Sequence, residues 1–136
     1  MRVSFWLVLI LPLVGTTKSF AQTCNDAADQ MQMNECAETA FKNADDELNS
    51  VYGNIVRRLK TDEVAKKLLV AAQKAWLRFR DAECAFISSA SSGGSIYPMI
   101  VANCRASITM ERVSGLKRYL SCEEGDMEGK QRLMVR

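Results

Sequence analysis

Apolar residues recur every three or four positions in three stretches of the chain, and this spacing predicts three α-helices. In an α-helix, positions three and four apart lie on the same face. The middle stretch shows the pattern most clearly, at Val64, Leu68, Ala72, Ala75, Phe79, Ala82 and Phe86. A second apolar line runs roughly 80–100° around the same helix, at Leu69, Trp76, Cys84 and Ile87. Two apolar lines require two neighbours, so we expect this helix to pack against both others.

Capping residues mark the expected starts of all three helices. Asp29, three residues before Gln32, forms a capping box that predicts the start of the first helix. Thr61 or Asp62 is expected to cap the second helix. Ser95 is expected to cap the third helix. Pro98 would then lie in the first helical turn, where a proline is tolerated because no intrahelical hydrogen bond is lost. The apolar positions of the first helix are Met33, Ala37, Phe41, Ala44, Leu48, Tyr52, Ile55 and Leu59; those of the third are Ile100, Val101, Cys104, Ile108, Leu116, Tyr119 and Leu120.

The segment 1–21 has the features of a secretory signal peptide: a basic start, a short apolar run and the small-x-small sequence Ser19-Phe20-Ala21. Residues 22–122 then form one helical domain, and 123–136 lack periodicity and are expected to be a mobile polar tail. The expected fold is all-α: a small disulfide-stapled up-down-up three-helix bundle after a cleaved signal peptide. We expect the protein to be exported, either periplasmic or secreted.

Composition argues against several classes of function. Without Arg2 and Lys18 in the signal segment, sixteen bases balance sixteen acids, which is not typical of a nucleic-acid-binding protein. The chain has no His, so Ser/His and Cys/His nucleophile pairs and the usual zinc ligand sets cannot form. We therefore expect no catalytic residues, no metal site and no cofactor, and the protein is not predicted to be an enzyme.

Five cysteines in an exported chain indicate disulfide bonds. Up-down-up packing sets Cys36 level with residue 86 and Cys84 level with Cys104, so Cys24, Cys36, Cys84 and Cys104 are expected to gather at one end of the bundle. We favour Cys36–Cys84 with Cys24–Cys104, and the main alternative is Cys84–Cys104 with Cys24–Cys36. Cys122 lies about 27 Å further along the third helix, so it is expected to be the free thiol.

One charged residue falls on an apolar stripe of the third helix. The same register sets Arg112 level with Trp76 and with Asp45, and a buried arginine without a partner would cost several kcal/mol. We therefore predict a structural ion pair between Asp45 and Arg112, in which the guanidinium could also lie over the Trp76 ring.

The segment Ser88–Tyr97 is rich in serine and glycine and is predicted to be a loop at the disulfide end. A loop held at both ends loses little entropy when it docks, so it could enter a cleft in a partner. A plain connector between helices is the alternative. The candidate partner-binding residues are Ser92, Gly93, Gly94, Ser95 and Tyr97.

Several short motifs occur together along the chain: Cys24, Met33-Asn34-Glu35-Cys36-Ala37, Ala44-Asp45-Asp46-Glu47-Leu48-Asn49 with Tyr52, Ala72 through Cys84, Gly93-Gly94-Ser95-Ile96, Cys104, and Thr109 with Arg112 and Leu116. In these motifs the chain resembles the LprI-like family of exported bacterial proteins. The resemblance implies an α-helical, disulfide-bonded fold.

For function, the resemblance implies a lysozyme inhibitor that blocks the lysozyme cleft by protein–protein binding. The family takes its name from a lipoprotein, and this chain departs from that lipoprotein because it lacks a lipid attachment signal before Cys24. The alternative is a cell-envelope interaction or structural module with another partner and no lysozyme inhibition. In either case we expect a protein partner, no nucleic acid, no membrane span, and a monomer or a Cys122-linked dimer.

Overall fold

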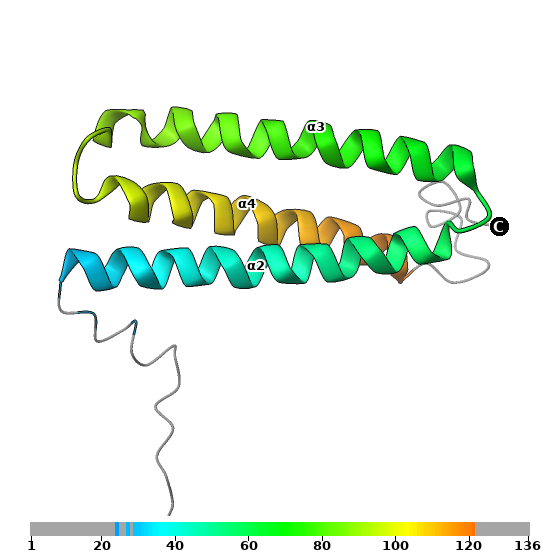
Figure 1. The fold of residues 1–136 in the computed structure, drawn as a ribbon, viewed down its shortest axis with the longest axis horizontal. Coiled ribbons are helices and arrows are strands. Elements are labelled where there is room, and N and C mark those ends of the chain that lie inside the picture. The colour runs from blue at the N-terminus through cyan, green and yellow to red at the C-terminus, as the bar shows by residue number, and fades with distance from the viewer. Residues whose placement is uncertain (1–23, 25–26, 28, 122–136) are drawn as a thin grey trace, which may run out of the picture.

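Three long helices run side by side with alternating direction in the computed structural model, which describes residues 24, 27 and 29–121 (Figure 1). They are α2 (Gln30–Arg58), α3 (Glu63–Ser88) and α4 (Tyr97–Leu120), and the 3₁₀ turn η1 (Ser89–Ser91) follows α3. The predicted all-α, up-down-up architecture is confirmed, and the described part contains no strand. The predicted signal peptide 1–21, the polar tail 123–136 and Cys122 lie outside the described residues.

Side-chain caps set the starts of two helices, as predicted. The Asp29 carboxylate accepts a hydrogen bond from the backbone N–H of Gln32, and the Asp62 carboxylate accepts one from Ala65. The prediction for the third helix was wrong, because Ile96 occupies the capping position and offers no side-chain acceptor. Pro98 does lie in the first turn of α4, where its missing N–H removes no helical hydrogen bond.

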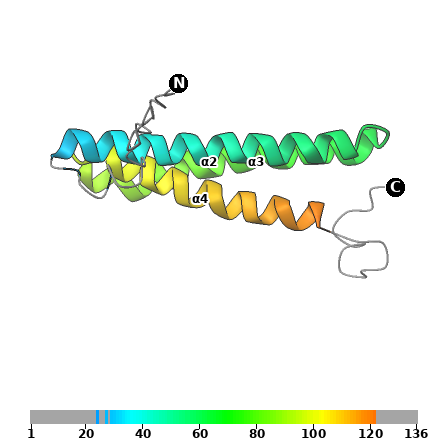
Figure 2. The same cartoon turned by 90° about the horizontal axis from the view of Figure 1, so that it is seen from below.

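The hydrophobic core lies mainly between α2 and α4, which pack along much of their length (Figure 2). Most of the predicted stripe of α2 points into it. The fully buried aliphatic side chains of this core are Leu48, Ile55, Leu59, Val113 and Leu116. Tyr52, Leu69 and Trp76 pack around its edge. The apolar spacing of α2 therefore identified the face that is buried.

Helix α3 is turned differently from the prediction. Its most regular apolar stripe faces outward, with 71% of Val64, 66% of Leu68, 54% of Phe79 and 75% of Phe86 exposed. The face turned toward the other helices instead buries Gln73, Arg80, Cys84 and Ser88. The second apolar line is only partly inside, since Trp76 is half-buried and Ile87 is exposed. Gln73 and Arg80 find polar partners on α2 and α4, whereas Ser88 donates to the Cys84 carbonyl of its own helix, so this orientation leaves none of the three unpaired.

Two disulfide bonds join the four cysteines that we expected to be paired. They connect Cys24 to Cys36 and Cys84 to Cys104, each with a Cα–Cα distance of 5.6 Å. The favoured pairing, Cys36–Cys84 with Cys24–Cys104, was therefore wrong, and the alternative is correct. Residues that lie level along two helices can still point to different neighbours: Cys84 is on the face toward α4, and Cys36 meets the segment that leads into its own helix.

No helix within residues 29–121 combines the length and the apolar character that a bilayer span requires.

Candidate functional site

The connection between α3 and α4 is built from consecutive tight turns. The backbone N–H groups of Ser92, Gly94 and Tyr97 donate to the carbonyls of Ser89, Ser91 and Gly94, at 3.2, 3.0 and 3.1 Å. The amides of Gly93 and Ser95 donate to no acceptor within the described part of the chain. The loop therefore has a defined backbone shape, and its unengaged N–H donors include those of Gly93 and Ser95.

Both glycines of this loop suit its geometry better than a residue with a side chain would. Gly93 has φ of 79°, a conformation that costs an L-residue roughly 1–2 kcal/mol. Gly94 has an ordinary φ, but an added Cβ would lie 3.2 Å from the carbonyl oxygen of Ser91. The sequence signal for these turns was the Gly-Gly pair itself.

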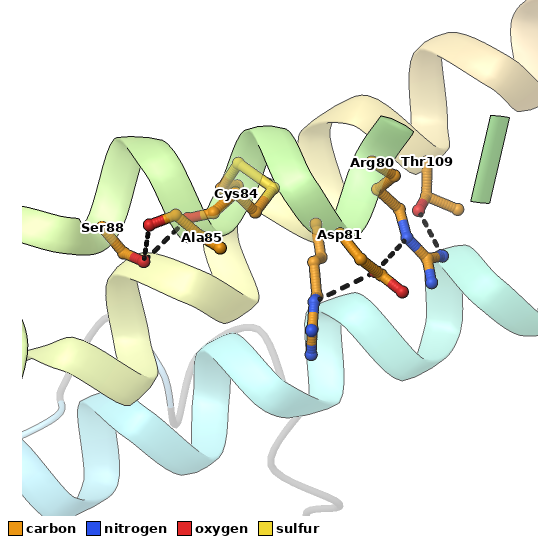
Figure 3. The surroundings of a disulfide bond; sticks show 8 residues. Arg80, Asp81, Cys84, Ala85, Ser88 and Thr109 are labelled. Atoms are coloured by element: carbon orange, nitrogen blue, oxygen red, sulfur yellow. Dashed lines mark hydrogen bonds and ion pairs between the residues drawn. A yellow bond between two sulfur atoms is a disulfide. The ribbon is translucent and has the colours of Figure 1, made fainter. Parts of the chain in front are cut away.

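The loop is fixed to the bundle on both sides. The side-chain amide of Asn34, near the start of α2, donates to the Ser95 carbonyl at 3.1 Å. On the α3 side, the loop follows the last turn of α3, and the Cys84–Cys104 bridge joins this turn to α4. Within the same turn, the buried hydroxyl of Ser88 donates to the Cys84 carbonyl at 2.7 Å (Figure 3). These contacts place the loop at the disulfide end of the bundle, as the register predicted.

Four of the five candidate binding residues are exposed at this end: Ser92, Gly93, Gly94 and Ser95. Tyr97 is only half-buried and starts α4. Ile96, which the sequence analysis did not select, is 41% exposed beside them. An isolated isoleucine in a sequence does not indicate that its side chain lies on a binding surface. The exposed surface of residues 92–96 is thus polar with one apolar side chain, that of Ile96.

Acidic residues of α2 lie on the same end of the molecule. Glu35 and Glu38 are exposed in the first turns of α2, close in sequence to Asn34, which contacts the loop. The Cys24–Cys36 bridge holds Cys24 against these turns. A partner that docks on the loop would therefore also meet negative charge.

A buried arginine links the three helices further along the bundle. Arg80 on α3 is 7% exposed, and its Nη1 lies 3.1 Å from Asp45 Oδ1 of α2 and 3.3 Å from Thr109 Oγ1 of α4. Its Nε donates to Asp81 Oδ1 at 3.1 Å (Figure 3). The guanidinium carbon lies 5.1 Å from the ring centroid of Phe41 and 5.3 Å from that of Trp76.

The predicted ion pair between Asp45 and Arg112 is wrong, because the Asp45 carboxylate forms its ion pair with Arg80. Arg112 donates instead from Nε to Gln73 Oε1 at 3.1 Å, and its guanidinium lies over the Trp76 ring at 5.8 Å. The register that set Arg112 level with Trp76 was correct. Sequence spacing did not distinguish Arg80 from the exposed basic residues around it.

Metal ligands do not gather in the described residues: no group of three or more His, Cys, Asp or Glu could hold an ion there. An open groove runs between α2 and α3. Among the predicted site residues only Asp45 lines it, together with Leu48, Asn49, Tyr52, Val70, Gln73, Lys74, Leu77 and Arg80.

Comparison with known proteins identifies relatives of the chain. The protein family described as "Lysozyme inhibitor LprI" matches residues 23–116. The chain is also 34% identical over 112 residues to the uncharacterized protein R02472 of Rhizobium meliloti (strain 1021), an alignment that covers 74% of this chain and 81% of the relative. No solved structure matches the chain.

Proposed function

Because the chain belongs to the LprI family of lysozyme inhibitors, we propose that it is an exported inhibitor that blocks a lysozyme cleft with the loop at its disulfide end. It acts by protein–protein binding and performs no catalysis. The two disulfide bonds agree with a life in an oxidising compartment outside the cytoplasm.

The observation that carries this proposal is that the loop is both exposed and held. Three backbone hydrogen bonds define its turns, Asn34 holds one side, and the Cys84–Cys104 bridge lies beneath the other. A preformed loop pays little conformational entropy on binding, so a small contact area can still give useful affinity. A flexible connector would lack this advantage.

The chemistry of the loop suits a polar sugar-binding cleft. Lysozymes place two carboxyl groups in that cleft. The hydroxyls of Ser92 and Ser95 and the free amides of Gly93 and Ser95 are donors that such acceptors can bind. Glu35 and Glu38 on α2 would then face the basic rim of the enzyme. Inhibition would follow from occupation of the cleft.

The experiment is a lysozyme turbidity assay with the purified, oxidised mature protein. We expect lysis to slow at a several-fold molar excess. Ser92→Tyr and Ser95→Tyr should abolish inhibition because a bulky ring at either position prevents the loop from entering the cleft. Ser50→Tyr, an exposed change far along α2, is the matched control and should inhibit like the parent.

Two results would contradict the proposal. Unchanged lysis at high excess would remove the inhibitor function and favour an envelope interaction or structural module with another partner. Inhibition that survives both loop substitutions would retain the function but place the contact elsewhere. A dimer on a non-reducing gel that disappears with Cys122→Ser would add support to the structural module.

A further inference from the structure

Helix α3 carries a continuous apolar face on the outside of the molecule. At 100° per residue, Val64, Leu68, Ala75, Phe79, Ala82 and Phe86 fall within an arc of about 60°, roughly opposite the buried Gln73, Arg80 and Cys84. The stripe from residue 64 to 86 is about 33 Å long at 1.5 Å per residue. In Figure 1, α3 forms an outer edge of the bundle, and neither α2 nor α4 covers its outward side. An apolar face of this length on a small protein marks an interaction surface.

Basic side chains line one edge of this face. Lys67, Lys74 and Arg78 are exposed and fall within about 40° of one another, some 90° from the middle of the stripe. Two acids, Glu63 and Asp81, lie about 20° beyond Lys74, but Glu63 pairs with Lys66 and Asp81 pairs with Arg80 and Arg105. The other edge carries Ala65, Ala72 and Glu83, so it offers one acid. Helix α3 holds five basic and three acidic residues, whereas α2 on the other side of the molecule holds three basic and five acidic. The apolar face therefore lies on a helix with a basic excess, and α4 also has a basic excess, with four basic residues and one acidic residue.

We propose that this face of α3 binds to the surface of an anionic lipid membrane. Phe79, Phe86, Leu68 and Val64 would enter the boundary between head groups and acyl chains. Lys67, Lys74 and Arg78 would contact the lipid phosphates, and each such residue strengthens association about fivefold near an anionic leaflet. The helix would lie in the plane of the surface, with the acidic helix α2 directed away from it.

A second copy of the chain fits the same face less well. In an antiparallel pair of helices, equivalent edges lie against each other, so the two rows of Lys67, Lys74 and Arg78 would repel. In a parallel pair, the basic row of each helix would face the opposite edge of the other helix. Glu83 is the only acid on that edge, so most of the bases would have no acidic partner. Charge complementarity thus favours an anionic surface over a dimer.

The test is co-sedimentation of the oxidised mature protein with vesicles. One set contains equal parts of phosphatidylcholine and phosphatidylglycerol, and the other contains phosphatidylcholine alone. We expect at least tenfold stronger binding to the phosphatidylglycerol vesicles at low salt, and weaker binding as salt is raised. The double variant Phe79→Ser/Phe86→Ser should lose at least tenfold, and Lys67→Gln/Lys74→Gln/Arg78→Gln should lose the preference for anionic vesicles.

Met110→Ser is the matched control, because Met110 is an exposed apolar side chain on α4 and its loss should leave binding unchanged. The helix signal in circular dichroism checks that each variant is folded, which is expected because the replaced side chains are exposed. Absence of binding, or equal binding to both vesicle types, would overturn the proposal. So would a dimer in light scattering that Phe79→Ser/Phe86→Ser abolishes, since a second copy would then cover the face. None of these outcomes depends on lysozyme inhibition.

Discussion

At the scale of single residues, Arg80 ties the three helices together. Its guanidinium reaches Asp45 on α2, Asp81 on its own helix and Thr109 on α4, and it lies between the rings of Phe41 and Trp76. A planar guanidinium can make in-plane hydrogen bonds and stack on aromatic faces at the same time, which a lysine cannot do. Together with the Gln73–Arg112 hydrogen bond and the Cys84–Cys104 bridge, this side chain helps to set the orientation of α3.

We predict that Arg80→Met lowers the free energy of unfolding by about 2 to 3 kcal/mol. The expected loss is smaller than the largest losses seen when one partner of a buried ion pair is removed, because the carboxylates of Asp45 and Asp81 are partly exposed to water. Urea unfolding measures the change. Arg78→Met, an exposed change two residues away, should stay within about 0.5 kcal/mol of the parent. Equal effects of the two substitutions would show that the Arg80 contacts do not stabilise the fold.

The sequence predicted that a buried arginine must be paired with Asp45, but it assigned the wrong arginine. Arg112 interrupts an apolar stripe, which made it visible in the pattern. Arg80 lies among Arg78, Lys74 and other basic residues, so its burial left no trace in the spacing. Only the rotation of α3 about its own axis decides which of these side chains is inside.

At the scale of elements, the same rotation explains why the apolar stripe of α3 was misjudged. Periodicity shows that a helix has an apolar face, but it does not show what covers that face. For α2, the covering element is α4, and the stripe is buried. For α3, the stripe is exposed, and polar residues with specific partners take the inner side. The caps at Asp29 and Asp62 were predictable because they depend on local backbone geometry.

Two glycines should respond to substitution by Ala with opposite sign. Gly93→Ala should destabilise the protein by about 1 kcal/mol because of its positive φ, although nothing lies within 4 Å of the new methyl group. Gly53→Ala should stabilise it by up to about 1 kcal/mol, since Gly53 lies inside α2 and the methyl group would make an ordinary contact with Arg57. Thermal unfolding measures both. Stabilisation by Gly93→Ala would contradict the turn conformation.

At the scale of the whole molecule, the two disulfide bonds determine how the helices are joined. Cys84–Cys104 holds α3 to α4 just below the loop, whereas Cys24–Cys36 fastens Cys24 to α2. Sequence register correctly grouped the four cysteines but could not choose between the pairings. The pairing depends on which neighbouring helix each cysteine faces. The position of a residue along the bundle axis does not show this.

Replacing Cys84 and Cys104 together by Ser should lower the free energy of unfolding by about 3 kcal/mol, as expected for a loop of this length, because the sequence separation is 20 residues. Non-reducing peptide mapping of the parent should recover Cys24 with Cys36 and Cys84 with Cys104. Recovery of a Cys36–Cys84 peptide would contradict the arrangement of the helices.

The account depends most on the claim that the preformed loop is the surface that meets lysozyme. Hydrogen–deuterium exchange of the oxidised protein with and without saturating lysozyme tests this directly. The account predicts that amides 92–96, among which Gly93 and Ser95 are unengaged in the free protein, become protected while the middle of α2 around Ser50 does not change. Unchanged exchange at 92–96 under conditions where lysis is inhibited would contradict it.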